Sequence, residues 1–408
     1  MTVRSRAALA AGSTARWASR VTGRGAGAMI GGLVALKLDR SVLRQLGVGR
    51  RTALVTGTNG KSTTTRMLAA ALSTTGRVAT NSEGANMDAG LVAALATARE
   101  APLAALEVDE MHVPHVADAL EPSVIVLLNL SRDQLDRVGE INHIERTLRA
   151  GLARHPSAVV VANCDDVLMT SAAYDCPNVI WVAAGGGWKN DSVSCPRSGE
   201  VIVRDGKDWR STGAEFSRPD PAWWFDDRAL HGPGGTTLAM RLALPGAVNR
   251  GNAAQAVAAA VAMGVDPAQA VAAVCGVDEV AGRYRTVQFG DHTARLLLAK
   301  NPAGWQEALA MVDRSATGVV IAVNGQVPDG EDLSWLWDVR FEHFGGTHVV
   351  AAGERGTDLA VRLGYAGVEH TLVHDTIAAI RSCPPGHVEV VANYTAFLNV
   401  QRTLERNG

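Results

Sequence analysis

The clearest chemical signal in the chain is a short loop between an apolar run and a helical pattern, Gly57-Thr58-Asn59-Gly60-Lys61-Ser62-Thr63. Glycines let backbone N–H groups crowd around phosphate oxygens, and a helix N-terminus adds the positive end of its dipole. The ammonium of Lys61 suits the outer phosphates, and the hydroxyl of Ser62 suits Mg²⁺. The loop lacks the first glycine of the longer common pattern. We therefore predict a nucleoside triphosphate site; a glycine-rich turn that merely opens a helix is the alternative.

Carboxylate and amide side chains at the ends of predicted elements are further candidates. Glu107 ends an apolar run, where open α/β sheets place their ligands, and Asp109 and Glu110 lie alongside as alternatives. Asn249 and Asn252, three residues apart at a predicted helix start, present two amides on one face. Helix capping is the simpler explanation for the asparagines, and a solvated strand end is the simpler explanation for Glu107.

The elements that must position these groups alternate along the chain. From about 50 to 165, short apolar runs alternate with helical stretches, which predicts a parallel sheet with crossover helices. The runs 103–108 and 123–128 are continuously apolar, as strands buried on both faces should be. A helix is expected over 249–263, and further strands over 294–298, 319–323, 348–352 and 389–392.

The predicted fold class is α/β, with a central P-loop parallel-sheet domain, an irregular insertion, and a smaller C-terminal α/β domain. We place an N-terminal segment at 1–48, the central domain at 49–287 and the C-terminal domain at 288–408. The insertion, about 188–232, is rich in Gly, Ser, Pro, Asp and Trp and has no helical period.

The composition indicates which partners and which cellular compartment the protein is suited to. A net charge of −2 gives no bulk field to recruit nucleic acid, and five scattered cysteines favour a reducing cytoplasm. The apolar run 28–36 is broken by Gly31-Gly32 and falls short of the roughly 20 apolar residues that a membrane span needs. The arginines before it leave two interpretations open, a solvated helix face and a helix lying on anionic lipid.

Several motifs together resemble a known superfamily. The core Thr58-Asn59-Gly60-Lys61-Ser62-Thr63 resembles the Mur ligases, which make amide bonds through acyl phosphates. Residues 129–137, Asn-Leu-Ser-Arg-Asp-Gln-Leu-Asp-Arg, are similar to that superfamily's second magnesium-side motif. Segments 300–304, 329–338 and 394–396 resemble the MurT family more narrowly. The resemblance covers nearly the whole chain, from about residue 25 onward.

The resemblance implies an ATP-dependent ligase that amidates the α-carboxylate of D-glutamate in the peptidoglycan stem peptide of lipid II. ATP would phosphorylate the carboxylate, and ammonia from a GatD-type glutaminase partner would attack the acyl phosphate. Implied cofactors are ATP and Mg²⁺. The implied location is the cytoplasm, at the inner face of the membrane, with peripheral contact to that surface left open.

The resemblance also implies roles for residues around the nucleotide. Ser62, Glu107 and Gln134 would hold magnesium, Gln134 standing where the amino-acid-adding ligases typically place a histidine. Its neighbour Asp133 is equally suited to capping a helix N-terminus. Loop 82–86 would lie on the substrate side.

Further implied residues lie at or beyond the domain junction. Asn249 and Asn252 would touch adenine, and Arg283 would meet nucleotide phosphate or ribose. Lys300 would approach the γ-phosphate from the second domain, which requires domain closure. An ordinary surface charge is the alternative for Arg283 and Lys300.

Three acids, Asp329, Asp332 and Asp338, crowd one C-terminal loop. The resemblance implies that an aspartate here completes the partner's Cys-His glutaminase site, because an acid orients a histidine. Asp332 is favoured over Asp338, and loop capping by solvated acids is the alternative.

The chain departs from the MurT pattern in two places. Where that family commonly carries a zinc ribbon with two Cys-x-x-Cys pairs, this insertion keeps Cys195 but has Ser211 and Ala214 at the second pair. A structural zinc site needs about four S or N ligands. We therefore expect no structural zinc in the insertion, with packing by Trp209, Phe216, Trp223 and Trp224 in its place. Asn324-Gly325 also stands where Asn-Asp is expected.

Two alternatives stay open. A free-standing Mur or folylpolyglutamate-type amino-acid ligase would often use a carbamylated lysine, and no good candidate lysine lies between 137 and 188. The changed insertion also leaves open a non-catalytic ATP-binding scaffold, and retention of Lys61, Ser62, Glu107 and Lys300 counts against it.

Overall fold

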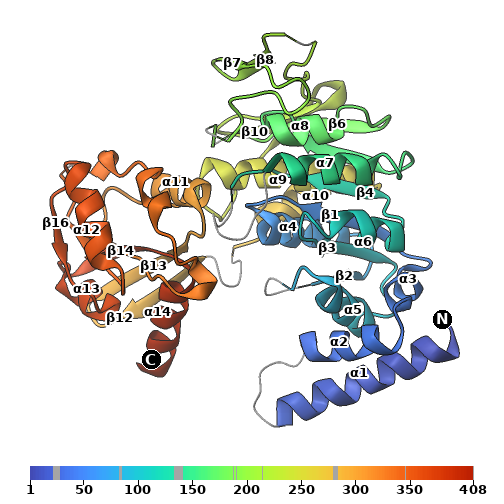
Figure 1. The fold of residues 1–408 in the computed structure, drawn as a ribbon, viewed down its shortest axis with the longest axis horizontal. Helices are drawn as coiled ribbons and strands as arrows, with labels where there is room; N and C mark the ends of the chain where they lie inside the picture. Colours follow the sequence, from blue (N-terminus) through green and yellow to red (C-terminus); the bar gives the residue numbers. More distant parts are fainter. Residues whose placement is uncertain are drawn as a thin grey trace. The chain divides into compact units, whose positions relative to one another are not determined.

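The computed structural model describes residues 1–21, 28–81, 85–132, 141–186, 188–189, 191–213, 215–278, 284–344 and 346–407. The described residues form two compact units: the first takes 1–130 and 141–278, and the second takes 131–132 and 284–407 (Figure 1). The predicted division into two α/β bodies is thus present.

A nine-stranded sheet forms the centre of the first unit, in the order β11-β10-β9-β6-β5-β4-β1-β3-β2. Its parallel strands are β1 (Arg51–Thr56), β2 (Val78–Thr80), β3 (Leu103–Glu107), β4 (Val124–Leu127), β5 (Val159–Asn163) and β6 (Val179–Ala183). Leu54 of β1 stands in register with Leu106 of β3 and Ile125 of β4. Because β3 and β4 are buried along their whole length, their continuously apolar sequences follow directly.

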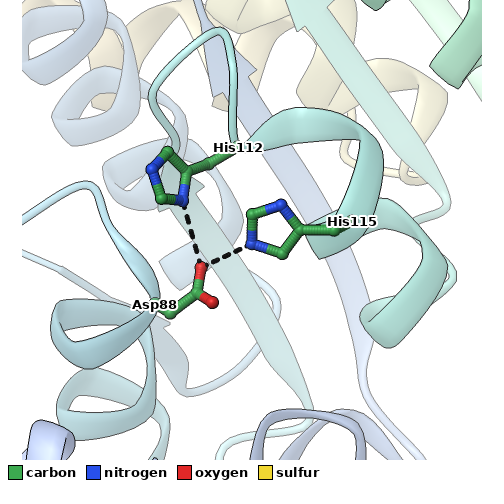
Figure 2. Close-up of side chains that lie close together, drawn as sticks. All are labelled: Asp88, His112 and His115. Carbon is green, nitrogen blue, oxygen red and sulfur yellow. Dashed lines mark hydrogen bonds and ion pairs between the residues drawn. The ribbon is translucent and has the colours of Figure 1, made fainter.

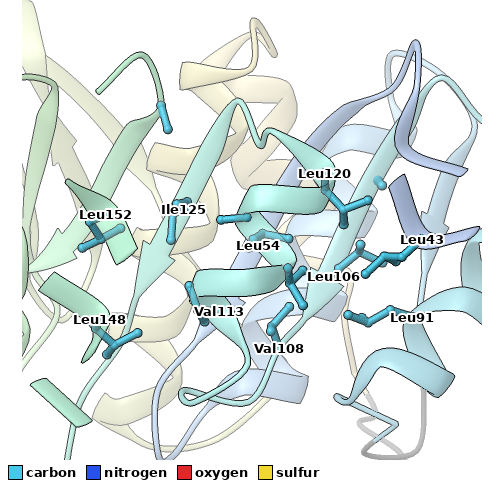
Figure 3. Packing of buried hydrophobic residues seen from close by; sticks show 14 of the residues in the cluster. Leu43, Leu54, Leu91, Leu106, Val108, Val113, Leu120, Ile125, Leu148 and Leu152 are labelled. Carbon is cyan, nitrogen blue, oxygen red and sulfur yellow. The ribbon is translucent and has the colours of Figure 1, made fainter. Parts of the chain in front are cut away.

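Helices cover both faces of this sheet. On one face, α4 (Lys61–Ser73), α9 (Ala247–Ala262) and α10 (Pro267–Cys275) pack against one another. The other face carries α3 (Val42–Gly47), α5 (Asp88–Thr97), α6 (Val113–Leu120), α7 (Ile141–Leu152) and α8 (Val167–Ala173). Figure 3 shows the core beneath that second face, where Leu43, Leu91 and Leu120 meet side chains of the strands.

The N-terminal segment is built into the first unit. Helices α1 (Val3–Val21) and α2 (Ala28–Leu38) meet so closely that a Cβ on Gly12 would lie 2.5 Å from the carbonyl oxygen of Gly31. A Cβ on Gly32 would lie 1.9 Å from the carbonyl oxygen of Ala89 in α5. The Gly31-Gly32 pair thus serves helix packing. Within the described ranges, no helix combines the length and apolar character needed to cross a membrane.

The insertion differs in part from its prediction. Only β7 (Ile202–Asp205) and β8 (Asp208–Ser211) form a separate hairpin. The strands β9 (Trp223–Phe225), β10 (Ala229–Gly232) and β11 (Thr236–Ala239) instead extend the central sheet, with β9 parallel to β6. These strands are three or four residues long, too short to show a period in the sequence.

The second unit has a six-stranded sheet in the order β12-β13-β17-β14-β15-β16. Its strands are β12 (Tyr284–Phe289), β13 (His292–Leu298), β14 (Gly318–Ala322), β15 (Val349–Ala352), β16 (His370–Leu372) and β17 (Gly386–Ala392). Its helices are α11 (Pro302–Met311), α12 (Gly356–Tyr365), α13 (Thr376–Ser382) and α14 (Tyr394–Asn407). All pairings are parallel except that of β12, so this body is also of the α/β type.

Candidate active site

The phosphate-binding loop connects β1 to α4, and two of its glycines are required by geometry. Gly57 has φ 140° and Gly60 has φ 84°, both in the region that favours glycine. A Cβ on Gly57 would lie 2.8 Å from the Cβ of Leu128, and one on Gly60 would lie 2.6 Å from Oδ1 of Asn252. The helix begins at Lys61, so its first N–H groups point toward the loop, as the sequence predicts for phosphate binding.

A single asparagine from the neighbouring strand holds the loop in shape. Asn129 follows β4, and its carbonyl oxygen accepts from the Thr58 N–H at 2.9 Å. Its side-chain Oδ1 accepts from the Asn59 N–H at 2.9 Å, while its Nδ2 donates to the Asn59 carbonyl at 3.0 Å. These hydrogen bonds define the conformation of the loop, and such preorganisation lowers the entropy cost of binding a ligand.

Lys61 is held at the mouth of the same loop. Its side chain is buried, with Nζ donating to the Gly57 carbonyl at 2.6 Å and pairing with Glu110 Oε1 at 3.2 Å. Glu110 was an alternative magnesium ligand from the sequence, and the structure gives it this lysine as a partner. A cation so placed suits the outer phosphates of a nucleotide.

Ser62 and Glu107 form the oxygen-rich part of the site. The Ser62 hydroxyl donates to Glu107 Oε2 at 2.7 Å, and Asn86 Nδ2 donates to Oε1 at 3.3 Å. The Asn81 side chain makes two hydrogen bonds to the backbone of Glu107. Its Oδ1 accepts from the Glu107 N–H and its Nδ2 donates to the Glu107 carbonyl, both at 2.8 Å. A hydroxyl beside a carboxylate is a donor set that Mg²⁺ prefers, so these residues fit the predicted ion.

The amides of α9 lie against the loop from the other side. Asn252 Nδ2 donates to Asn249 Oδ1 at 3.3 Å, and Asn249 Nδ2 donates to the Pro245 carbonyl at 2.6 Å. One turn on, Gln255 Nε2 donates to the Leu127 carbonyl at the end of β4 at 2.8 Å. The predicted asparagine pair thus lies beside Gly60, where the loop enters α4.

Three predicted positions lie outside the described residues. They are the candidate ligand Gln134, its neighbour Asp133, and Arg283. Residues 82–84 of the predicted substrate-side loop also lie outside them, whereas Ala85 and Asn86 are described.

Lys300 belongs to the second unit, just before α11. Its Nζ lies 4.8 Å from the centre of the Tyr394 ring, within the range of a cation–π contact. The next residue, Asn301, caps α11 by accepting from the Gly304 N–H at 2.8 Å. Lys300 is exposed in its own unit.

The three acids of the C-terminal loop have different surroundings. Asp329 is buried and accepts from the N–H and hydroxyl of Thr395, and burial raises the pKa of its carboxyl. Asp338 pairs with Arg132 at 3.6 Å. Asp332 is exposed and accepts from the Ser334 N–H at 2.8 Å. Asp329 is therefore structural, and Asp332 is the acid most open to solvent.

The insertion brings Ser198 and Ser211 together beside Cys195, whereas Ala214 lies outside the described residues. Ser198 and Ser211 lie with hydroxyl oxygens 3.5 Å apart, beside the buried Cys195. Burial opposes ionisation of Cys195, but hydrogen bonds from Ser198, Ser211 and nearby backbone N–H groups outweigh it and lower the pKa of the thiol. Trp209 and Phe216 pack with Cys195 as expected. Trp223 is buried as well, with its ring against Gly232.

One packing prediction is wrong. Trp224 is 43% exposed and stacks on the ring of His231, with centroids 3.8 Å apart. Neighbouring residues of a strand face opposite sides of the sheet, and at β9 the side of Trp223 is covered whereas the side of Trp224 is open to solvent.

Sequence reasoning gave no role to Asn81 and Gln255, and it included Asn129 only as the first residue of segment 129–137. In the structure each of the three side chains fixes a loop or a strand end at the site. A further signal was the position of Asn129 directly after the apolar run 123–128, where a parallel strand ends.

A P-loop after the first strand of a parallel sheet, a serine–glutamate pair beside it and a second α/β unit define an ATP-dependent ligase of the Mur type. The sequence model of the Mur ligase middle domain matches residues 55–260, and that of the MurT ligase C-terminal domain matches 298–397. The chain belongs to the Mur ligase family.

Individual proteins agree with this assignment. The chain is 28% identical to the MurT subunit of the glutamine-hydrolysing lipid II isoglutaminyl synthase of Streptococcus pneumoniae, over 93% of each chain. Its fold is similar to a pseudomurein peptide ligase type C from Methanothermus fervidus, with TM-score 0.70, 16% identity, and 90% and 81% of the two chains covered. It is also similar to the Mycobacterium tuberculosis folylpolyglutamate synthase complexed with ADP, with TM-score 0.63, 16% identity, and 89% and 92% covered.

Proposed function

We propose that the chain is the synthetase subunit of an enzyme that amidates the α-carboxylate of D-glutamate in the stem peptide of lipid II. The observation that carries the proposal is similarity to a MurT subunit over 93% of both chains, together with an intact phosphate loop and its Glu107 partner. The products would be the amide, ADP and inorganic phosphate.

The chemistry has two steps. A carboxylate oxygen of the substrate attacks the γ-phosphorus of ATP and the bond to ADP breaks, giving an acyl phosphate. Ammonia then attacks the acyl carbon, loses a proton and expels phosphate. Alignment and charge neutralisation are the main tasks of a protein in phosphoryl transfer.

The residues of the first unit supply that environment. Backbone N–H groups of the loop and the start of α4 hold phosphate oxygens, and Lys61 neutralises charge on the outer phosphates. Ser62 and Glu107, with Gln134 as a further candidate ligand outside the described residues, would hold Mg²⁺, which would screen phosphate charge. Asn249 and Asn252 receive the adenine edge. Lys300, and Arg283 outside the described residues, would add positive charge near the nucleotide phosphates.

A glutaminase of the GatD type is the proposed source of ammonia. Asp332, or in second place Asp338, orients the histidine of that partner. An exposed aromatic patch near this loop supports docking of the partner. Trp337 and Tyr365 are 57% and 78% exposed, and their rings pack edge to face with centroids 5.3 Å apart. Val361 of α12 is 51% exposed in the same region. Exposed aromatic residues are common anchors of protein interfaces.

Peripheral contact with the inner membrane surface forms part of the proposal. Met29, Ile30 and Leu33 share one face of α2 and are 42%, 40% and 58% exposed. Arg4 and Arg6 of the neighbouring α1 are exposed and suited to anionic headgroups. Sedimentation with vesicles containing an anionic lipid should fall for Leu33→Glu and not for Val193→Glu in the insertion.

The deciding experiment combines the purified chain with its companion glutaminase, ATP, Mg²⁺ and a lipid-linked muropeptide. Glutamine should give amidated product and an equal amount of ADP, and ammonium chloride should replace glutamine. A free-standing amino-acid ligase would require an amino acid instead. A chain that forms no ADP with either nitrogen source would contradict the proposal.

A further inference from the structure

A carboxylate and two imidazole rings to which no role has been assigned above converge in the first unit. Figure 2 shows Asp88, the first residue of α5, with His112 and His115 from the start of α6. Asp88 Oδ1 lies 2.7 Å from His115 Nε2 and 3.3 Å from His112 Nδ1. The three donor atoms all lie within 4.8 Å of one another.

These separations suit a shared metal ion. In a tetrahedral zinc site with bonds of about 2.0–2.2 Å, neighbouring donor atoms stand roughly 3.3 Å apart. The 3.3 Å separation from His112 equals that value, whereas the 2.7 Å separation from His115 is that of a hydrogen bond and must lengthen by side-chain rotation for an ion to lie among the three atoms. Imidazole nitrogens favour zinc, cobalt and nickel over magnesium and calcium. Three protein ligands also leave a fourth position open, as in zinc sites that accept a further ligand.

Asp88 is favourable in the first turn of α5 because of the helix dipole. Its Oδ1 also makes hydrogen bonds to both imidazole rings, which lie one turn apart at the start of α6. These contacts hold three metal-binding side chains together, and a cation could take the place of the shared hydrogen bonds. The side chains are 31–50% exposed, so an ion can reach them and substitutions there leave no buried cavity.

We propose that Asp88, His112 and His115 form a binding site for a divalent cation of the zinc class, with one exchangeable coordination position. The site would tie the start of α5 to the start of α6. It lies next to the turn that carries Glu110, because the His112 N–H donates to the Asp109 carbonyl at 2.9 Å and the Asp109 N–H to the Asn86 carbonyl at 3.1 Å. The proposal is independent of the substrate proposed above.

The test is metal titration of the full chain after treatment with a chelator. Isothermal titration with zinc chloride should show one equivalent bound, and cobalt chloride should give the visible absorption of a tetrahedral ion. His115→Gln and Asp88→Asn should each weaken binding at least tenfold. The matched control, His143→Gln on the exposed surface of α7, should bind as the parent does. Circular dichroism and thermal unfolding verify that each variant is folded.

A second control separates this site from the insertion. Cys195→Ser should leave zinc content unchanged if the proposed cluster holds the ion. Loss of zinc in Cys195→Ser, equal weakening in His143→Gln, or a parent protein that binds no zinc would overturn the proposal.

Discussion

The phosphate site of the first unit and the acidic loop of the second unit are built in opposite ways. At the phosphate site, Lys61 and Glu107 are 8% and 4% exposed, and each is fixed by side-chain and backbone hydrogen bonds. At the acidic loop, Asp332 is exposed and its aromatic neighbour Trp337 is 57% exposed. The first arrangement is preorganised for a small, highly charged ligand. The second presents groups outward, as expected of a surface that works when another chain covers it.

The largest effect is expected at the buried site. Lys61→Met should lower ATP-dependent amidation by on the order of 10²–10³-fold, because charge on the transferring phosphates loses its cation. Coupled ADP release measures the loss, and Lys207→Met in the exposed β7–β8 turn is the matched control. The double variant Lys61→Met, Glu110→Gln removes the carboxylate left without its lysine. If the double variant recovered activity, the loss in Lys61→Met would come from misfolding around the unpaired Glu110 carboxylate. It would then not come from lost neutralisation of charge on the phosphates.

A substitution in the acidic loop should impair glutamine-dependent amidation but not ammonia-dependent amidation. Asp332→Asn keeps a side-chain acceptor for Ser334 but removes the charge offered to the partner's histidine. We expect glutamine-dependent amidation to fall by about tenfold or more, with ammonia-dependent amidation unchanged. Asp338→Asn serves as the comparison. A greater loss in Asp338→Asn would transfer the role to that residue.

The exposed aromatic patch of the second unit should contribute to the affinity for the glutaminase. Trp337→Ala should weaken glutaminase binding by roughly 30-fold, equivalent to about 2 kcal/mol for an aromatic anchor, with little change in thermal stability. Biolayer interferometry with the purified partner measures this effect. Trp17→Ala, at a position 64% exposed in the first unit, should bind normally. Equal binding by both variants would remove the patch from the interface.

A further effect is expected at the hydrogen bonds that support the buried site. Asn81→Ala leaves the Glu107 N–H without its partner and should lower the free energy of unfolding by about 1–3 kcal/mol. The Mg²⁺ concentration for half-maximal activity should rise by about tenfold or more as Glu107 loses its orientation. Denaturant titration and a magnesium titration measure the two effects. Asn178→Ala, which removes an exposed hydrogen bond to Pro156, should change neither.

Much of the fold was predictable because burial leaves a direct trace in the sequence. Strands buried on both faces must be continuously apolar, so 103–108 and 123–128 identified β3 and β4. The strands β9 to β11 were missed because three or four residues are too few to show alternation. Trp224 was placed in the interior because composition alone does not say which side of a strand faces the core.

The sequence by itself was enough to predict the phosphate-binding loop, because such a loop uses the local backbone of one short segment and the helix after it. Only the tertiary structure decided which distant side chains complete it. The order β4-β1-β3-β2 sets the ends of neighbouring strands beside the loop, so Asn129 meets Asn59 across 70 positions of sequence and Asn81 meets Glu107 across 26. The same order brings Asp88 to His112 and His115. Strand order is set by packing of the whole sheet, and no short stretch of sequence encodes it.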